Sequence, residues 1–242
     1  MKKLFFVAAA LFAAVSFSAC SEEDESSGNV PTEMRYVKTI TMDHDVINIE
    51  YDDQHRIIKF GNNDLVYDGN TVLISQSKRI QLNNAGYVTA TESYDGSSQA
   101  YRTDATYEYD AEGQLIASNY NSIVELGYRY RWENRNRYTS WSTDSEDYGY
   151  VYKNTYTTLK TPPCNLDFSN PNNWTEAYGL PLGKQCSNLI EIAETSSKNS
   201  DYMEGYRYAY EFDQEGYISK IIETWYANGN EDEVTTYETS YY

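Results

Sequence analysis

The sequence predicts an all-β protein: an antiparallel meander of about 14 strands in hairpins, forming a strongly curved sheet or an open barrel. Two observations predict it. A tight-turn pattern recurs along the chain, and apolar and polar residues alternate in the segments between the turns. Beyond the N-terminus, no segment has the apolar period of about 3.6 residues that marks a surface helix.

The recurring turn is clearest in YEYDAEGQL, residues 107–115. Asp110 is followed by two residues that tolerate the right-handed helical region and then by Gly113, where a positive φ is needed. This order predicts a type I turn closed by a left-handed residue. The pattern recurs four times with a residue that tolerates positive φ at the glycine position. The other segments are 49–57 with His55, 80–88 with Gly86, 130–138 with Asn136 and 210–218 with Gly216.

The spacing of these turns predicts stacked hairpins that bury one continuous face. The turn segments begin at residues 49, 80, 107, 130 and 210. The face is visible in residues 205–213, where Tyr206, Tyr208, Tyr210 and Phe212 alternate with Arg207, Ala209, Glu211 and Asp213. Such alternation predicts antiparallel strands with the tyrosine side buried and the charged side in water.

The N-terminus predicts export and lipid anchoring. Residues 1–19 place two lysines before an apolar run that is short for a membrane span, as in a secretory signal peptide. Small residues precede Cys20 as in the lipobox of bacterial lipoproteins, so Cys20 is predicted to be acylated; the alternative is ordinary cleavage that leaves it without lipid. Residues 20–31 are predicted to be an acidic tether, and residues 32–242 a single β-hairpin-repeat domain.

The charge of the chain limits the partners that it can bind, and its cysteines predict a disulfide. Beyond the signal peptide, 17 of the 19 basic residues remain against 37 acidic ones, which disfavours nucleic acid and anionic lipid as partners. Cys164 and Cys186 flank the one segment without the repeat pattern and would be exported to an oxidising compartment. They are therefore predicted to form a disulfide; the alternative is two buried thiols.

No motif for catalysis or metal binding stands out. His44 and His55 are the only histidines, and Asp43-His44-Asp45 lacks the second cluster that a metal site needs. The sequence contains no Gly-x-Ser-x-Gly elbow, P-loop, dinucleotide fingerprint or calcium loop. We therefore predict no metal, no cofactor and no catalytic residues. A glycan-directed hydrolase with paired carboxylates stays as the enzyme alternative.

Tyrosine dominates the composition, with 26 of the 242 residues. A tyrosine ring buries apolar area while its hydroxyl needs a partner or water, so we expect a partly wet concave face with cross-strand tyrosine ladders. Most of these rings are predicted to be structural. Trp174 and Tyr178 lie instead between the two cysteines, outside the repeats, and are predicted to contact a ligand.

Several of these features together resemble a family of Bacteroidetes surface lipoproteins that carries a domain of unknown function. The features are Cys20 with its acidic tether, the hairpins at 107–115 and 210–218, and the Leu-Pro-Leu-Gly…Ser-Asn-Leu-Ile segment at 180–190. The resemblance covers residues 32–242. It implies an open, porin-like β-barrel whose hairpins are similar to the YD repeats of secreted toxins. The acids after Cys20 also resemble the surface-export signal of that phylum.

Together these observations predict a lipid-anchored protein of the outer membrane that faces the cell exterior and binds a glycan or a peptide. The alternative is a structural or adhesive surface protein without a ligand pocket. A transmembrane barrel is disfavoured, because the predicted outward positions hold charged residues that are costly in hydrocarbon. The membrane is therefore expected to be contacted through the anchor alone.

Overall fold

The computed structural model describes residues 31–242, except for residues 44, 122–125, 143–149, 169–176 and 198–202. Within this part the chain is all β, and sixteen strands follow one another as an antiparallel meander. The first eight are β1 Val37–Met42, β2 Asp45–Tyr51, β3 Ile57–Phe60, β4 Asn63–Asp68, β5 Thr71–Ile74, β6 Lys78–Leu82, β7 Val88–Asp95 and β8 Ala100–Tyr109. The last eight are β9 Leu115–Tyr120, β10 Leu126–Glu133, β11 Asn136–Ser142, β12 Tyr150–Lys160, β13 Asn188–Ser197, β14 Met203–Phe212, β15 Ile218–Ala227 and β16 Asn230–Tyr241.

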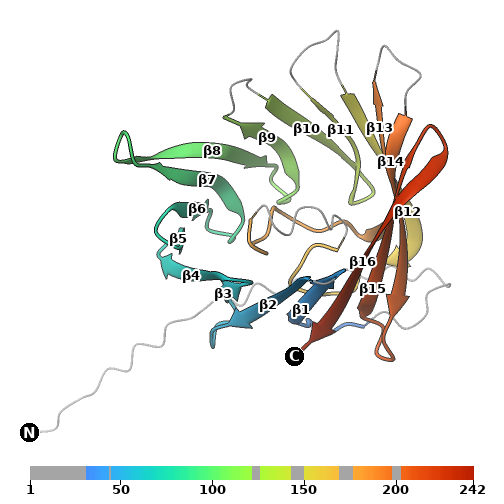
Figure 1. Ribbon diagram of the computed structural model, residues 1–242, viewed down its shortest axis with the longest axis horizontal. Coiled ribbons are helices and arrows are strands. Elements are labelled where there is room, and N and C mark those ends of the chain that lie inside the picture. The colour runs from blue at the N-terminus through green and yellow to red at the C-terminus, as the bar shows by residue number, and fades with distance from the viewer. Residues whose placement is uncertain (1–30, 44, 122–125, 143–149, 169–176, 198–202) are drawn as a thin grey trace, which may run out of the picture.

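The meander closes into a barrel because β1 pairs with β16 (Figure 1). The predicted all-β antiparallel meander is confirmed. The strand number of about 14 was too low, because several strands between residues 57 and 82 are only four to six residues long. The sheet is closed rather than open, so every strand has two neighbours.

Four of the five predicted turns lie at one end of the barrel, the floor end, and share one set of bonds. The side-chain Oδ1 of the first residue accepts the backbone N–H groups two and four positions later, at 2.9 to 3.0 Å. Its backbone carbonyl accepts the N–H of the left-handed residue. The turns begin at Asp52, Asn83, Asp110 and Asp213, and their left-handed residues are His55, Gly86, Gly113 and Gly216.

The fifth turn is different, and the prediction of a left-handed Asn136 was wrong. Glu133 pairs directly with Asn136, and the two residues between them, Asn134 and Arg135, have φ values of 50° and 60°. The other turns begin with Asp or Asn, whose short side chains reach the backbone two residues on, whereas Glu133 is one methylene longer. Asn136 instead bonds to Asn188, whose backbone N–H it accepts at 3.0 Å.

Residues 161–168 and 177–187, between β12 and β13, do not form a hairpin; they fold back into the floor end and are called the plug. In Figure 1 they form the orange trace inside the ring of strands. The plug is tied to the barrel by backbone hydrogen bonds. Pro181 O accepts the N–H of Val88 at 3.0 Å, and the N–H of Lys184 donates to Gly113 O at 2.9 Å. The floor end is thus occupied by protein.

The hydrophobic core lies between the plug and the inward side chains of the floor half. Leu166 and Phe168 of the plug are each 1% exposed and belong to one cluster with the strand residues. Fully buried strand members include Val37, Ile40, Ile49, Val72, Ile80, Val88, Ile218 and Ile221. The tyrosines of β14 point inward as predicted, whereas Phe212, which continues their alternation at the floor end, is 38% exposed.

The predicted disulfide between Cys164 and Cys186 is not formed; both side chains are buried thiols, as in the alternative. Cys164 Sγ donates to Leu166 O at 3.1 Å, whereas Cys186 Sγ lies 3.4 Å from Tyr156 Oη. The two thiols therefore contact different groups. The Gln185 side chain joins the two ends of the plug instead, with Nε2 donating to Cys164 O at 2.8 Å and to Leu166 O at 3.0 Å.

Candidate functional site

The inner surface of the barrel changes from apolar to polar with distance from the floor. On β6, buried Ile80 is followed toward the opposite end, the mouth end, by exposed Lys78. On β15, fully buried Ile221 is followed by Glu223 and Trp225 at the next inward positions. The plug and the barrel wall together make a cup with an apolar floor and a polar, aromatic wall. Two recesses lie on this wall.

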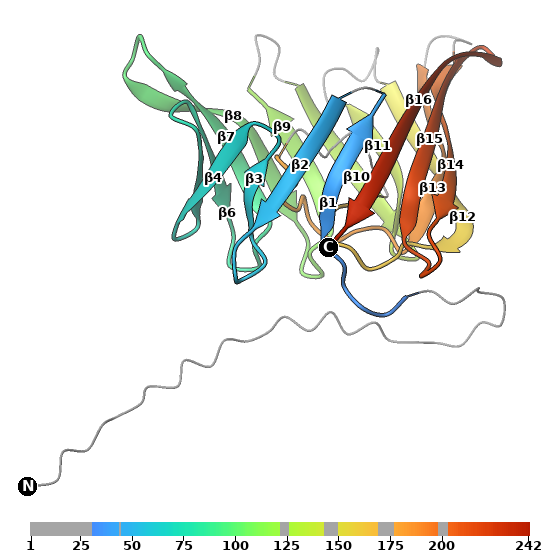
Figure 2. The same cartoon turned by 60° about the horizontal axis from the view of Figure 1, so that its bottom comes forward.

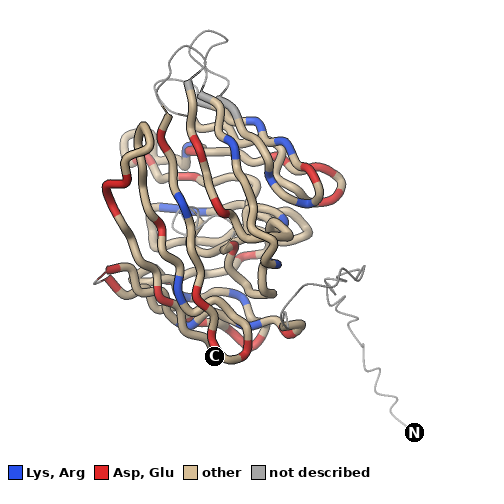
Figure 3. Tube along the Cα trace, turned by 90° about the vertical axis from the view of Figure 1, so that its right-hand side faces the viewer, with Lys and Arg blue, Asp and Glu red and all other residues tan. Residues whose placement is uncertain are grey.

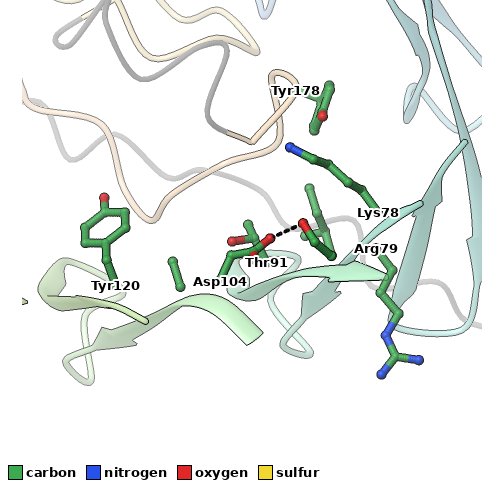
Figure 4. A pocket seen from close by; sticks show the side chains of 9 residues that line it. Lys78, Arg79, Thr91, Asp104, Tyr120 and Tyr178 are labelled. Carbon is green, nitrogen blue, oxygen red and sulfur yellow. Dashed lines mark hydrogen bonds between the residues drawn. The ribbon is translucent and has the colours of Figure 1, made fainter. Parts of the chain in front are cut away.

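The first recess has a volume of about 380 Å³ and lies where the plug meets β6 to β9; we call it the Tyr178 recess. It is lined by Lys78, Arg79, Ile80, Thr91, Ser93, Asp104, Ala105, Tyr120 and Tyr178. Figure 4 shows Lys78 pointing toward Tyr178, whereas Arg79 points away from the recess. Ser93 Oγ donates to Asp104, the bond drawn as a dashed line. One ammonium, one carboxylate, hydroxyls and two rings thus face one space.

Tyr178 is held there by a strained turn of the plug. Its φ is 53° and that of Gly179 is 75°, and the turn is closed by a 2.9 Å bond from Leu180 N to Ala177 O. A Cβ on Gly179 would lie 2.9 Å from Ile57 Cδ1, so only glycine fits against the barrel wall here. This close approach fixes the turn, and the turn fixes the direction of the Tyr178 ring.

The second recess has a volume of about 360 Å³ and lies on the β14–β16 wall; we call it the Glu223 recess. It is lined by Tyr206, Glu223, Trp225, Glu233 and Thr235. Glu223 is only 5% exposed, and Tyr237 Oη donates to its Oε1 at 3.1 Å. Burial, followed by the charge of Glu223, raises the pKa of the Tyr237 phenol. Two carboxylates and two aromatic rings therefore share this recess.

The structure places the predicted site residues in different ways. Tyr178 lines a recess, where the sequence predicted a ligand contact. Trp174 and Cys20 lie outside the described residues, so their predicted roles stay predictions. Cys164 and Cys186 belong to the packing of the plug and line neither recess.

Sequence reasoning missed the charged members of both recesses, namely Lys78, Asp104, Glu223 and Glu233. Each lies on a strand where charged residues also occur at outward positions, as Arg79 does next to Lys78. The signal that could have found them is the pairing register. Residues opposite each other in adjacent strands share a face, and Tyr208 pairs with Glu223.

Two further properties of the described residues bear on the chemistry of the site. No group of three or more His, Cys, Asp or Glu side chains there could hold a metal ion. His55 occupies its turn, with its ring 4.5 Å from that of Tyr36. Across the same residues, no helix is both long and apolar enough to cross a membrane.

Comparison with known proteins identifies the fold. No family model and no curated protein matches the sequence. The chain has a porin-like barrel fold. A solved porin-like protein from Bacteroides vulgatus ATCC 8482 matches with a TM-score of 0.61 and 16% identity, covering 86% of this chain and 99% of that one. A second, from Bacteroides uniformis ATCC 8492, matches with a TM-score of 0.62 and 16% identity, over 86% and 100% of the two chains.

The two matches confirm the barrel that the family resemblance implied. At 16% identity they establish the fold alone. Membership of the lipoprotein family and similarity to YD repeats stay predictions.

Proposed function

We propose that this protein is a lipid-anchored binding protein of the outer membrane that takes a glycan in the Tyr178 recess. The observation that carries the proposal is the strained turn that presents Tyr178. A left-handed backbone costs a non-glycine residue on the order of 1 kcal/mol and persists only where the surrounding structure imposes it, commonly at functional sites. Here the strain places an aromatic ring over hydrogen-bonding groups.

The chemistry of the Tyr178 recess suits a sugar. A pyranose presents apolar C–H faces that stack on aromatic rings, and Tyr120 and Tyr178 supply two half-buried rings. Its hydroxyls both donate and accept, which matches Lys78 as a donor and Asp104 as an acceptor. A ligand pocket of this kind combines flat apolar surface with a few placed polar groups.

A peptide fits the same cup less well. Extended peptides commonly bind by adding a strand to an open sheet edge. All sixteen strands of the described chain have partners on both sides, because β1 pairs with β16. A peptide would therefore rely on side-chain contacts alone, without main-chain pairing.

The path of the chain supports a mouth that points away from the anchoring membrane. Tyr217 Oη donates to Glu33 O at 2.7 Å, and the Arg35 guanidinium lies 4.5 Å from the centre of the Tyr217 ring. Both contacts are at the floor end, beside the turn that begins at Asp213. In Figure 2 the blue N-terminal segment leaves the barrel at this end. A tether of residues 20–31 anchored at Cys20 would then place the floor toward the lipid.

The outer face supports a domain that is tethered in water rather than embedded. Outward side chains form ion pairs between neighbouring strands, such as Lys59 with Glu50 at 3.5 Å and Lys220 with Glu211 at 3.7 Å. Figure 3 shows charges of both signs along the length of the strands, not only at their ends. A lipid-facing barrel needs an uninterrupted apolar band there. The porin-like Bacteroides matches support the outer-membrane address through the shared fold alone.

A second candidate is a structural or adhesive surface protein without a ligand. The observation that favours it is the floor half of the barrel, which is filled by the plug and by fully buried Leu, Ile and Val side chains. The two candidates differ in the cup above the plug, which a scaffold would not need to keep open.

A glycan array tests the proposal with the full chain carrying Cys20→Ser, which removes the acylation site. We expect a defined set of glycans to bind, and Tyr178→Ala to weaken binding by at least about tenfold, the loss of roughly one stacked ring. Tyr94→Ala is the matched control, because Tyr94 is 44% exposed on the outer face of β7. Silence of the array toward a folded barrel would refute the glycan proposal and favour the scaffold.

A further inference from the structure

We propose that the Glu223 recess is a separate binding site for a cationic group, a protonated amine. This inference is independent of the glycan proposal, because it rests on other residues on another wall of the cup. Its ligand class is set by charge: both ionisable side chains other than tyrosine that line the recess are carboxylates, and none of the five lining residues is basic.

The strand register stacks the recess in two levels. Tyr206 of β14 pairs with Trp225 of β15, which places both rings at one height on the inner wall. One inward position deeper, Tyr208 pairs with Glu223, and Glu223 pairs with Thr235 of β16. Because β14 runs from the mouth to the floor, a ligand from the mouth meets the two rings first and Glu223 below them.

The carboxylates make this space strongly attractive to a cation. Glu223 is 5% exposed, and a charge removed from water interacts more strongly with an opposite charge than a solvated one does. Glu233, on the first half of β16, is exposed at the edge of the recess. After burial, the charges of Glu223, Glu204 and Glu233 raise the pKa of the Tyr206 phenol, so their negative potentials overlap at that ring.

The aromatic rings favour the same ligand. The face of a tryptophan or tyrosine ring attracts a cation within about 6 Å of its centre, most strongly when the site is shielded from water. Tyr206 and Trp225 are both partly buried and line the recess together with the carboxylates. An amine between these rings would add cation–π attraction to its pairing with Glu223.

The lining of the Glu223 recess differs from that of the Tyr178 recess and from that of a metal site. The Tyr178 recess has a similar volume but combines Lys78 with Asp104, so it lacks this one-sided charge. A divalent metal ion is disfavoured as the occupant, since no group of three or more carboxylate, thiol or imidazole ligands occurs among the described residues. The net charge of −18 would also steer cations toward the barrel over longer distances.

The test compares cyclohexylammonium with cyclohexanol, which share a ring and differ in charge. Isothermal titration uses the full chain with Cys20→Ser. We expect the amine to bind at least about tenfold more tightly than the alcohol. We expect Glu233→Gln to weaken amine binding several-fold and Trp225→Ala to abolish it. The matched control is Glu238→Gln, which removes the same charge from the outer face of β16, opposite Lys220.

Any one of three results would overturn the proposal that the Glu223 recess binds an amine. Equal binding of amine and alcohol would show a merely apolar recess. Equal weakening by Glu233→Gln and Glu238→Gln would show attraction to the overall charge alone. Displacement of the amine by calcium at equal concentration would show a metal site. Glu233 is exposed, so its variant is expected to fold, and thermal unfolding of each variant verifies this.

Discussion

A single side-chain oxygen organises each of four turns at the floor end. Asp52, Asn83, Asp110 and Asp213 each use Oδ1 to accept two backbone N–H groups, so Asp and Asn are interchangeable in this role. The residue three positions later takes the left-handed backbone conformation. The atoms around it then determine how much a side chain at that position would lower the free energy of unfolding.

Gly113 and Gly86 provide a matched test of that cost. Their φ values are 83° and 82°, but a Cβ on Gly113 would lie 2.8 Å from Tyr87 Cε2, whereas a Cβ on Gly86 would have no heavy atom within 4 Å outside the two adjacent residues. We expect Gly86→Ala to lower the free energy of unfolding by about 1–2 kcal/mol, from backbone strain alone. Gly113→Ala should lose about 2–4 kcal/mol, because the Tyr87 ring must also move. Urea unfolding measures both; equal losses would contradict the steric argument.

The two plug cysteines are expected to be chemically silent in the folded protein. Burial raises the pKa of the Cys164 and Cys186 thiols, and the thiol form is a poor nucleophile. In the chain with Cys20→Ser, a thiol-specific reagent should modify neither residue in buffer and both residues in denaturant, without prior reduction. A mass two hydrogens lower in the unreduced protein, with no modification in denaturant, would instead restore the predicted disulfide.

At the scale of elements, aromatic side chains hold the floor ends of neighbouring strands together. Seven of them in the described chain donate a hydrogen bond, 2.5 to 3.0 Å long, to a carbonyl of the preceding strand. The pairs are Tyr51 to Val37, Tyr67 to Ile57, Tyr109 to Val88, Trp132 to Leu115, Tyr156 to Arg137, Tyr210 to Ile190 and Tyr241 to Ile218.

These bonds follow one rule of position. In every pair the two strands are joined at the mouth end, and the accepting carbonyl lies two residues below the last paired residue of its strand. For example, β13 and β14 pair down to Ile192, and Tyr210 bonds to Ile190 O. The hydroxyl, or the indole N–H of Trp132, therefore spans the point where the two strands separate. This gives six tyrosines of the described chain the kind of structural role that the sequence predicted for most of the 26.

Removing one such hydroxyl should leave a carbonyl without its partner. We expect Tyr210→Phe to lower the free energy of unfolding by about 1–2 kcal/mol. The control is Tyr94→Phe, at an exposed outer position, with a change within about 0.5 kcal/mol. Denaturant midpoints of both variants measure the difference, and two equal midpoints would reject the structural role of the hydroxyl.

The plug contributes to stability through its apolar side chains. Leu166 is 1% exposed in the core, while Leu159, just before the plug, is 46% exposed. We expect Leu166→Ala to lower the free energy of unfolding by about 2–5 kcal/mol, because it leaves a cavity. Leu159→Ala should change it by less than about 0.5 kcal/mol. If Leu166→Ala were as mild as Leu159→Ala, the plug would not be part of the core.

At the scale of the whole molecule, the tyrosine-rich interior makes stability depend on high pH. Burial raises the pKa of Tyr67 to about 12. Burial also raises the pKa values of Tyr51, Tyr156, Tyr210 and Tyr241. In the unfolded chain these phenols ionise near pH 10. The unfolded state then binds fewer protons than the folded state, so stability is full below about pH 10 and falls as pH rises through the folded values.

Alkaline titration tests this dependence. Absorbance of phenolate at 295 nm and circular dichroism are followed together from pH 9 to pH 13. We expect the buried phenols to ionise only as the barrel unfolds, with both signals changing together above about pH 10. The same titration in denaturant should show a single ionisation near pH 10. Complete ionisation with the β signal unchanged would contradict a buried, hydrogen-bonded tyrosine interior.

The candidate site was only partly predictable. Tyr178, which lines a recess, was singled out from the sequence because it lies in the one segment that lacks the repeat pattern, and its contact with a ligand stays a prediction. Lys78, Asp104 and Glu223 were missed because alternation gives two faces without saying which is inward, and each β-bulge shifts that alternation by one residue. Such a shift between Lys220 and Ile218 of β15 leaves Ile218 and Ile221, three residues apart, both fully buried.

By itself, the sequence determined the features set by neighbouring residues: antiparallel hairpins, four of five turns and the inward tyrosine face of β14. Their physical causes, backbone φ preference and period-two alternation, act over a few residues. Tertiary structure alone decided the closure of β1 on β16, the folding of the plug into the floor, and the separation of the cysteine thiols. These depend on which distant segments fill a shared interior, and close packing settles that only when the whole chain is assembled.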